Sequence, residues 1–265
     1  MRELSLFSGA GGGVLGSKLL GHRIIGYVEF DAYCQEILKQ RIADGILDAA
    51  PIFGDIRKFI SEGYAADYKG MVDIITAGFP CQPFSVAGKR GGENDARNMW
   101  PETLEVIRRV KPKFVFLENV PGLKSNPYFR KILRQISESR YDAKWTCLGA
   151  DDIGANHRRK RLWILAYAQS RESRKPTKWK RRENFSGGSE EKYLAEPSSI
   201  YVERFKDGQE EGKSRRSSWW SVEPRVGRVV TGFPSRVDRL KALGNAQVPI
   251  QMAYAFSILS KGVIE

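Results

Sequence analysis

Short apolar runs alternate regularly with helical patterns over residues 1–168, and this alternation limits the folds open to the chain. Each apolar run has the length of a buried strand, and these runs lie at 3–7, 23–30, 71–77, 113–118, 144–150 and 161–168. Helical patterns occupy 12–20, 32–42, 101–110 and 127–139. Because consecutive parallel strands are joined by a crossover that is usually a helix, this alternation predicts a mostly parallel α/β sheet.

The composition changes after Ser170. Residues 171–218 are rich in Arg, Lys, Glu, Ser and Gly and contain few aliphatic residues, which is typical of a disordered insert or of a small unit ordered by a partner. Apolar patterning returns at 228–249, and a final amphipathic helix is expected from 249 to 262. We therefore expect one large domain, formed by residues 1–168 and a return segment at 236–265, with a separate variable region at 169–235.

The charge of the chain indicates a polyanionic partner. There are 44 Lys and Arg residues against 31 Asp and Glu, a net charge of +13. Residues 157–182 hold eleven Lys or Arg and a single acid, Glu172, with Trp and Tyr interleaved. A basic run is more often a solvated face, but the interleaved aromatics and the sign of the whole chain favour nucleic acid. Lys178, Lys180 and Arg181 are the candidate phosphate contacts.

Several classes of protein are disfavoured. No run of apolar residues reaches the length of a membrane span, and the N-terminal residues lack the layout of a signal peptide, so we expect a cytoplasmic protein. The chain has three cysteines without CxxC spacing and two histidines, which argues against a zinc site or any other metal site. Cys34 and Cys147 lie in apolar-patterned segments and are expected to be inert, buried side chains.

A glycine-rich turn and two acids predict a nucleoside pocket. LFSGAGGG (6–13) joins the first strand to the first helix, and clustered glycines let a ligand approach the main chain there. Glu29 ends the second strand about twenty residues later, where an acid suits ribose hydroxyls. Asp55 follows at GDI (54–56), where it could accept a hydrogen bond from an adenine amino group. The spacing is not GxGxxG, which disfavours a dinucleotide.

The stretch AGFPCQPFS (77–85) sets Cys81 between two prolines, which end any strand or helix and place the thiol on a stiff loop. Glu118 ends the next predicted strand, one βαβ unit later. Both side chains are therefore expected at the carboxyl edge of adjacent parallel strands, where open α/β sheets bind ligands. A thiol beside a carboxylic acid and a nucleoside pocket indicates a nucleophile with a proton donor.

In their order, LFSGAGG, GDI, GFPCQPFS, ENV (118–120) and GNAQVP (244–249) resemble the successive motifs of DNA cytosine-5 methyltransferases. The resemblance covers residues 3–168 and about 228–260, and the C-terminal part resembles the phage and prophage branch. It implies a Rossmann-like, S-adenosyl-L-methionine-dependent methyltransferase domain at 1–168, completed by 236–265, and a small target-recognition lobe at 169–235.

By this resemblance the Cys81 thiolate adds to carbon 6 of a cytosine flipped out of duplex DNA, and carbon 5 then accepts the methyl group. Glu118 protonates or shares a proton with ring nitrogen 3, which requires a raised carboxyl pKa. Arg159 and Arg161 match the two arginines of the family's Q-x-R-x-R motif, which contact the base and its phosphate. Nearby cations also favour the thiolate.

The resemblance further assigns binding residues by position. The cofactor contacts are Phe7, Gly9, Gly11, Gly12, Glu29, Phe30, Asp55, Ile56, Pro80, Trp100 and Asn245, with Phe30 and Trp100 flanking the adenine or the methionine arm. Ser85, Arg97 and Asn119 match positions that line the flipped base, its phosphates and the closing loop, and they are predicted as DNA-binding residues. The chain is expected to be monomeric, and a cognate restriction endonuclease is a candidate partner.

Two departures from the family pattern stand out. Asn156–His157 replaces the usual proline–glutamine, and the variable region is short for a target-recognition domain. Three alternatives stay open at this point. Methylation of tRNA cytosine uses the same chemistry, although RNA methylators of this family tend to depart from GFPCQPFS. A catalytically silent DNA-binding relative is disfavoured by intact Cys81 and Glu118, and a flavin or nicotinamide oxidoreductase is disfavoured by the glycine spacing.

Overall fold

The computed structural model describes residues 1–80, 98–169 and 236–264. Within these residues the strands are β1 (Arg2–Leu6), β2 (Arg23–Val28), β3 (Ile52–Phe53), β4 (Ile74–Ala77), β5 (Phe114–Asn119), β6 (Tyr141–Leu148) and β7 (Arg161–Ala168). The α-helices are α1 (Gly12–Leu19), α2 (Ala32–Ala43), α3 (Ile56–Ser61), α4 (Tyr64–Asp67), α5 (Trp100–Val110), α6 (Pro127–Glu138), α7 (Arg236–Asn245) and α8 (Pro249–Ser260). Two 3₁₀ turns, η3 (Pro121–Leu123) and η4 (Asp151–Ile153), lie in loops.

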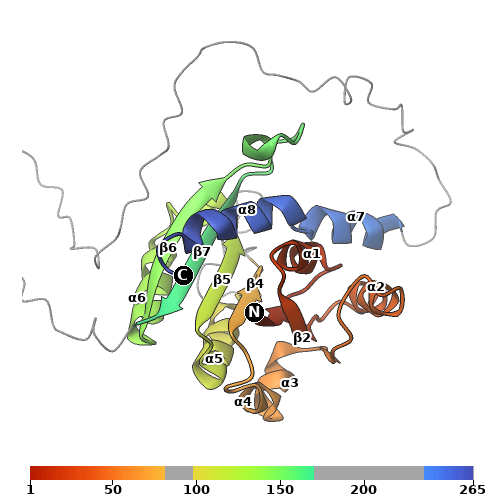
Figure 1. Ribbon diagram of the computed structural model, residues 1–265, viewed down its shortest axis with the longest axis horizontal. Coiled ribbons are helices and arrows are strands. Elements are labelled where there is room, and N and C mark those ends of the chain that lie inside the picture. Colours follow the sequence, from red (N-terminus) through yellow and green to blue (C-terminus); the bar gives the residue numbers. More distant parts are fainter. Residues whose placement is uncertain (81–97, 170–235, 265) are drawn as a thin grey trace, which may run out of the picture.

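The strands form one twisted sheet in the order β3-β2-β1-β4-β5-β7-β6 (Figure 1). Strands β1 to β5 are parallel to one another, whereas β7 pairs antiparallel with both β5 and β6. The prediction of a mostly parallel α/β sheet is confirmed. The connection between β6 and β7 carries only a 3₁₀ turn, which suits an antiparallel pair because a parallel crossover usually contains an α-helix.

The core lies on both faces of the sheet, because successive side chains of a strand point in opposite directions. Ile75, Val115 and Leu117 pack in the cluster that includes the buried residues of α5 and α6. Ile74 and Phe116, which alternate with them, pack instead with the buried residues of α8. Burial on two faces explains why these strands read as continuous apolar runs rather than as alternating ones.

Several helices begin at side-chain caps that the sequence supplies locally. The carboxylate of Asp31 accepts the N–H of Cys34 at α2, and Asp55 accepts the N–H of Arg57 at α3. Helix α3 lies with β3 and α4 in residues 52–67, for which the sequence predicted no regular element. Strand β3 has two residues and α4 has four, which is too few for a periodic pattern of apolar residues.

The return segment forms two helices that extend across the face of the sheet where α1 lies, shown in blue in Figure 1. Met252, Ala255, Phe256 and Leu259 of α8 are buried. This arrangement brings residues near the C-terminus next to the turns that follow β1 and β4. The predicted lobe at 169–235 falls, apart from Gln169, outside the described residues.

Candidate active site

The strand order reverses between β1 and β4, because the chain runs outward from β1 to β2 and β3 and then returns to β4 on the other side. Ligands of open α/β sheets bind at the carboxyl edge of such a switch point. A cavity of about 50 Å³ lies there, between the turn after β1, the end of β4 and the return segment. Its lining brings together five of the predicted site residues, Phe7, Gly9, Gly12, Glu118 and Asn245.

The turn after β1 takes backbone conformations that favour glycine. Gly9 and Gly11 have φ angles of 55° and 85°, and Phe7 takes a φ of 53°, which is strained for an aromatic residue and is typical of functional sites. Arg41 of α2 donates from Nη1 to the carbonyl of Ala10 at 2.6 Å. The place of a Cβ on Gly11 would face Arg41, so Gly11 shapes the turn against α2 and does not line the cavity.

Glu29 follows β2 and is 9% exposed. Its two carboxylate oxygens accept the N–H of Gly9 at 2.6 Å and the N–H of Asp31 at 2.8 Å. Burial raises the pKa of this carboxyl, and the two backbone donors oppose that shift. Each carboxylate oxygen can accept a further hydrogen bond, so Glu29 fixes the glycine turn and still has capacity for ligand hydroxyls.

A second cavity, of about 350 Å³, is lined by residues that follow β2 and by residues of β3 to α4. Phe30, Phe53, Asp55 and Tyr64 are among the residues that line it. One oxygen of Asp55 accepts the N–H of Arg57 at 2.8 Å, and the other is available. Aromatic walls with one acceptor carboxylate suit a flat heterocycle that carries an amino group.

Glu118 emerges at the carboxyl edge of β5. Strands β4 and β5 are parallel neighbours in which Ala77 lies opposite Leu117, so the next residues, Gly78 and Glu118, reach the same edge. A Cβ on Gly78 would lie 3.1 Å from Oε2 of Glu118. The segment that leads into Cys81 and the end of the next strand thus meet at one edge of the sheet, while the expected place of Cys81 itself falls outside the described residues.

The Glu118 carboxylate forms an ion pair with Arg161, the first residue of β7. Nε of Arg161 lies 2.7 Å from Oε1, and the two side chains are 21% and 14% exposed. Burial raises the pKa of Glu118, while Arg161, Arg159 and a hydrogen bond from Gln247 oppose the shift. The site therefore holds a carboxyl that retains its proton to higher pH than an ordinary glutamic acid, with a guanidinium beside it.

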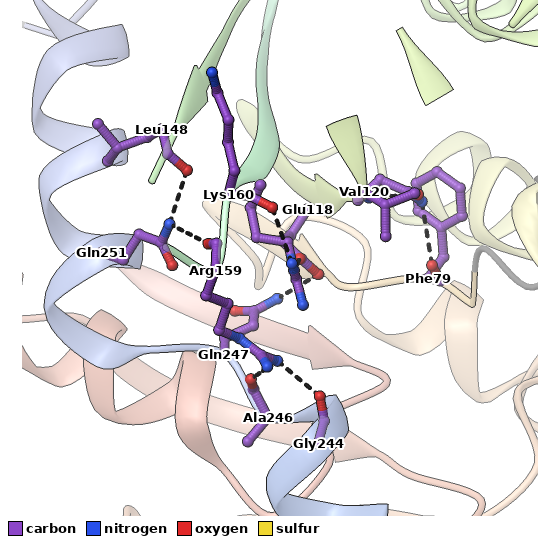
Figure 2. A network of polar contacts seen from close by, with 12 residues as sticks. Phe79, Glu118, Val120, Leu148, Arg159, Lys160, Gly244, Ala246, Gln247 and Gln251 are labelled. Atoms are coloured by element: carbon purple, nitrogen blue, oxygen red, sulfur yellow. Dashed lines mark hydrogen bonds and ion pairs between the residues drawn. The ribbon is translucent and has the colours of Figure 1, made fainter. Parts of the chain in front are cut away.

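Arg159 joins the return segment to the site (Figure 2). Its Nη2 donates to the carbonyl of Gly244 at 3.0 Å and also to that of Ala246. In the reverse direction Gln251 of α8, which is fully buried, donates from Nε2 to the carbonyls of Leu148 and Arg159 at 2.8 and 3.0 Å. The two predicted arginines, Arg159 and Arg161, thus lie at the same site, and Gln251 of α8 fixes the backbone of Arg159.

A further ion pair ties α7 to the opposite side of the glycine turn. Nζ of Lys241 lies 2.5 Å from the Asp31 carboxylate, which also caps α2. Lys241 is the largest of the influences that hold the pKa of Asp31 below its usual value. The return segment consequently contacts both the Glu29 side and the Glu118 side of the site.

Two predicted cofactor contacts have other environments. Trp100 is 1% exposed, and its Nε1 donates to Oε1 of Gln135 at 2.8 Å, so it belongs to the core and does not flank a ligand. Its ring packs against Phe79, close to the end of β4. Ile56 is 4% exposed and packs in the same cluster beneath Asp55. Both residues were placed at the cofactor by resemblance alone, which does not reveal the direction of a side chain.

Asn119 also requires a correction. It was predicted to bind DNA, but it is 2% exposed, and its Nδ2 donates to the carbonyl of Phe79 at 3.2 Å. Its Oδ1 accepts the N–H of Val120 at 2.9 Å. Asn119 therefore holds the backbone at Phe79, two residues before Cys81.

Some predicted residues lie outside the part of the chain that the structure describes. These are Cys81, Ser85, Arg97, Lys178, Lys180 and Arg181, and Pro80 is the last described residue before the cysteine. Of the other cysteines, Cys34 is buried as expected, and burial raises the pKa of its thiol to about 11. Cys147 is half-buried, and burial raises its pKa too. Neither thiol is disposed to react as a thiolate near neutral pH.

Sequence reasoning missed three residues that shape the site, namely Arg41, Gln247 and Gln251. Gln247 stands inside GNAQVP, a motif from which only Asn245 was selected. Gln251 is a polar residue on an otherwise apolar stretch of α8, which is a recognisable signal for a buried hydrogen-bonding group.

Among the described residues no group of His, Cys, Asp and Glu could hold a metal ion. None of the helices that these residues form is long and apolar enough to cross a bilayer.

Comparison with known proteins finds relatives that share sequence and fold with this chain. The Type II methyltransferase M.NgoMIV of Neisseria gonorrhoeae is 33% identical over 168 residues, 62% of this chain and 51% of that protein. The Type II methyltransferase M.CviJI of Paramecium bursaria Chlorella virus IL3A is 34% identical over 166 residues, 62% of this chain and 42% of that protein. The chain thus spans about half the length of the curated relatives it matches.

A prophage-encoded E. coli protein described as a DNA modification methyltransferase has a crystal structure that superposes with a TM-score of 0.51 at 26% identity. The match covers 63% of this chain and 47% of that one. The family model for C-5 cytosine-specific DNA methylases matches residues 1–232, which is most of the sequence. This chain therefore belongs to the C-5 cytosine-specific DNA methylase family.

Proposed function

We propose that this protein transfers a methyl group from S-adenosyl-L-methionine to carbon 5 of cytosine in duplex DNA. The observation that carries the proposal is the Glu118–Arg161 pair at the carboxyl edge of β5, where it faces the segment that leads into Cys81. Membership of the family supplies the class of reaction. Because the chain spans about half the length of its curated relatives, activity of the whole protein is a proposal to be tested.

The residues around the glycine turn fit the cofactor. Glu29 can accept from ribose hydroxyls, and Asp55 can accept from an adenine amino group between Phe30 and Phe53. The smaller cavity at the glycine turn and Asn245 would hold the amino-acid end. When bound, S-adenosylmethionine supplies an electrophilic methyl group.

The protein's own groups activate the base. Addition of the Cys81 thiolate to carbon 6 forms a carbon–sulfur bond and moves the electron pair of the 5,6 double bond to carbon 5. Protonation of ring nitrogen 3 by Glu118 neutralises the charge that would otherwise develop on the ring. Carbon 5 then takes the methyl group as the bond between that group and the cofactor sulfonium breaks, which would leave the cofactor as a neutral thioether. Loss of the carbon-5 proton to solvent restores the 5,6 double bond and expels the thiolate, and nitrogen 3 returns its proton to Glu118. The raised pKa of Glu118 suits a group that must carry a proton near neutral pH.

Duplex DNA is the proposed substrate, with the target base flipped out of the stack because a stacked base is out of reach of an enclosed site. The basic stretch that includes Lys178, Lys180 and Arg181 is proposed to contact phosphates, which position a protein without reading sequence. Ser85 and Arg97 are proposed to act at the flipped base and its phosphates.

The test is expression in a host without cytosine methylation, followed by bisulfite sequencing of its DNA and its tRNA. We expect protection of cytosines in one recurring DNA context, and loss of that protection with Cys81→Ala. Protection of tRNA cytosines alone would overturn the DNA assignment in favour of the RNA alternative. Absence of any protection from well-folded protein would favour a silent DNA-binding relative.

Two finer proposals concern partners. The curated relatives are named Type II methyltransferases, which motivates the proposal that a restriction endonuclease shares the recognition site of this protein. Plasmid DNA from the expression host should then resist a nuclease of that specificity. We also propose that the protein acts as a monomer, and light scattering of the free protein and its DNA complex tests this.

A further inference from the structure

Gln247 of the return segment is enclosed by three glycines from two other parts of the chain. Its backbone lies against Gly12, and its side-chain oxygen lies against Gly13, so closely that a Cβ on either glycine would collide with it. A Cβ on Gly78 would lie 2.7 Å from Nε2 of Gln247. The close approach of the Gln247 backbone therefore requires glycine at position 12, whereas a larger residue at 13 or 78 would displace the side-chain amide of Gln247.

The far end of this side chain reaches the carboxyl of Glu118 (Figure 2). Nε2 of Gln247 lies 3.5 Å from Oε2 of Glu118, whereas Arg161 pairs with the other oxygen, Oε1. Each carboxyl oxygen thus has its own donor, one from β7 and one from the return segment. Two donors from different elements restrict rotation of a carboxyl more than one donor does.

We propose that Gln247 is a positioning residue for the reaction, which holds the second carboxyl oxygen of Glu118 while Arg161 holds the first. This inference rests on the proposed function, because it assigns Gln247 a part in the same chemistry. At 3.5 Å the hydrogen bond is long, so its contribution is orientation and not strong binding. The return segment would then act on the proton-donating group directly, and not only through packing.

Among the described residues, the charged groups that face Glu118 are the guanidinium groups of Arg161, on β7, and Arg159, in the loop before it. The other two neighbours, Gln247 of the return segment and Gly78 after β4, carry no charge. A donor to an ionised carboxylate favours the ionised form and lowers its pKa. Removal of the Gln247 amide should therefore raise the pKa of Glu118 further.

The experiment replaces Gln247 by methionine, which keeps the length of the side chain and removes the donor. Carbon-13 labelling of glutamate carboxyls, with Glu118 assigned from the signal that Glu118→Gln removes, follows the titration of that group by NMR. We expect the Glu118 midpoint to move to higher pH in Gln247→Met. This measurement needs no turnover, so it reports on Gln247 even if the proposed methylation fails.

Turnover gives the second readout. If Glu118 must carry a proton, the single-turnover rate falls as pH rises through its pKa. We expect Gln247→Met to lower the maximal single-turnover rate about tenfold and to shift the pH at which that rate declines to a higher value. The affinity for S-adenosylmethionine, measured by calorimetry, should stay within about twofold of that of the parent. A structural defect alone would lower the rate without moving the fall.

Two further variants complete the design. Gly13→Ala should displace the Gln247 amide and move the Glu118 midpoint in the same direction, with no additional effect in Gln247→Met. Gln40→Met makes the same chemical change on an exposed position of α2, where Gln40 bonds Asp44, and should change nothing. An unmoved Glu118 midpoint in folded Gln247→Met, or weaker cofactor binding without a moved midpoint, would overturn the inference.

Discussion

The two ends of the site are assembled in different ways. The end that we propose binds adenosine, here called the adenosine end, is lined by Phe30, Phe53, Asp55 and Tyr64 and comes from residues 30–64. The carboxyl end joins Glu118 to Arg161 of β7 and to Gln247, which is 129 residues away in sequence. A pocket that only binds can be built locally, whereas a buried carboxyl needs partners from distant elements to offset its loss of hydration.

This difference implies different consequences of mutation. Changes at the adenosine end should alter cofactor affinity and leave the rate at saturation largely intact. Changes at the carboxyl end should alter the rate and leave affinity largely intact, because interactions that strengthen only in the transition state affect turnover.

The largest expected effect concerns Cys81, the nucleophile that we propose. DNA with 5-fluorocytosine at the target should form a lasting covalent complex with the parent in the presence of S-adenosylmethionine, because fluorine at carbon 5 cannot leave as a proton. Cys81→Ser should abolish this complex, which denaturing electrophoresis detects. Cys34→Ser and Cys147→Ser are the matched controls and should trap as the parent does. Equal trapping by Cys81→Ser would contradict the covalent mechanism.

The next effect isolates the carboxyl end. Glu118→Gln keeps the size of the side chain and a hydrogen-bonding group but cannot supply a carboxylic proton. We expect turnover to fall about 100-fold or more, with DNA and cofactor affinity little changed. Rapid-quench kinetics with both substrates saturating measure the rate. Near-parental turnover would reject the role of Glu118, and a large loss of cofactor affinity would show that the two ends are not separable.

The adenosine end should respond in the opposite sense. Glu29→Ala and Asp55→Ala should each weaken S-adenosylmethionine binding by roughly 1–3 kcal/mol, the usual scale for a lost hydrogen bond to an enclosed ligand. Calorimetry measures the affinity, and turnover at saturating cofactor should stay near that of the parent. Glu36→Ala, an exposed acid on α2 paired with Lys39, provides the control. Unchanged affinity in both variants would mean that the pocket is elsewhere.

The same contrast explains what the sequence could predict. Strands, crossover helices and the acids Glu29 and Asp55 were predictable because their signals are local, namely apolar runs, a glycine turn and acids after strands. The pairing of Glu118 with Arg161 was not predicted, because the resemblance assigned this arginine to the base and its phosphate. The contact with Gln247 was not predicted, because it depends on how α8 packs against α1 and the sheet.

Burial was the second property that the sequence concealed. Trp100 and Asn119 match the family pattern in order and spacing, yet both side chains turn into the interior. Asn119 illustrates the reason, because a hydrogen bond to the carbonyl of Phe79, just after the neighbouring strand β4, fixes the direction of its side chain. A one-residue difference in where a strand ends decides whether a side chain lies on the ligand edge or inside, and sequence patterns do not resolve strand ends that finely.

The smallest expected effect concerns Asp73, at the opposite edge of the sheet. It tests whether the stability of the fold can change without a change in cofactor affinity or turnover. The Asp73 carboxylate accepts the backbone N–H of Arg2 at 2.8 Å, and Nε of Arg2 and Nζ of Lys113 lie 3.3 and 3.5 Å from it. The hydrogen bonds from Arg2 lower the pKa of Asp73 to about 2. A lowered carboxyl pKa stabilises the fold above the unfolded value of about 3.9, and the benefit is lost as pH falls from about 4 to about 2.

Because both cationic partners are largely exposed, we expect Asp73→Asn to cost only about 1 kcal/mol of unfolding free energy at neutral pH. Urea unfolding of the parent and the variant should show this difference narrowing as pH falls through the same range. Cofactor affinity and turnover should match the parent, because Asp73 precedes β4 while both ends of the site lie beyond the carboxyl ends of the strands. A difference that stayed constant down to pH values near 2 would assign the effect to packing and not to the charge. A change in turnover would show that strain at one edge of β4 reaches Gly78 at the other, and the two edges of the sheet could then no longer be treated as independent.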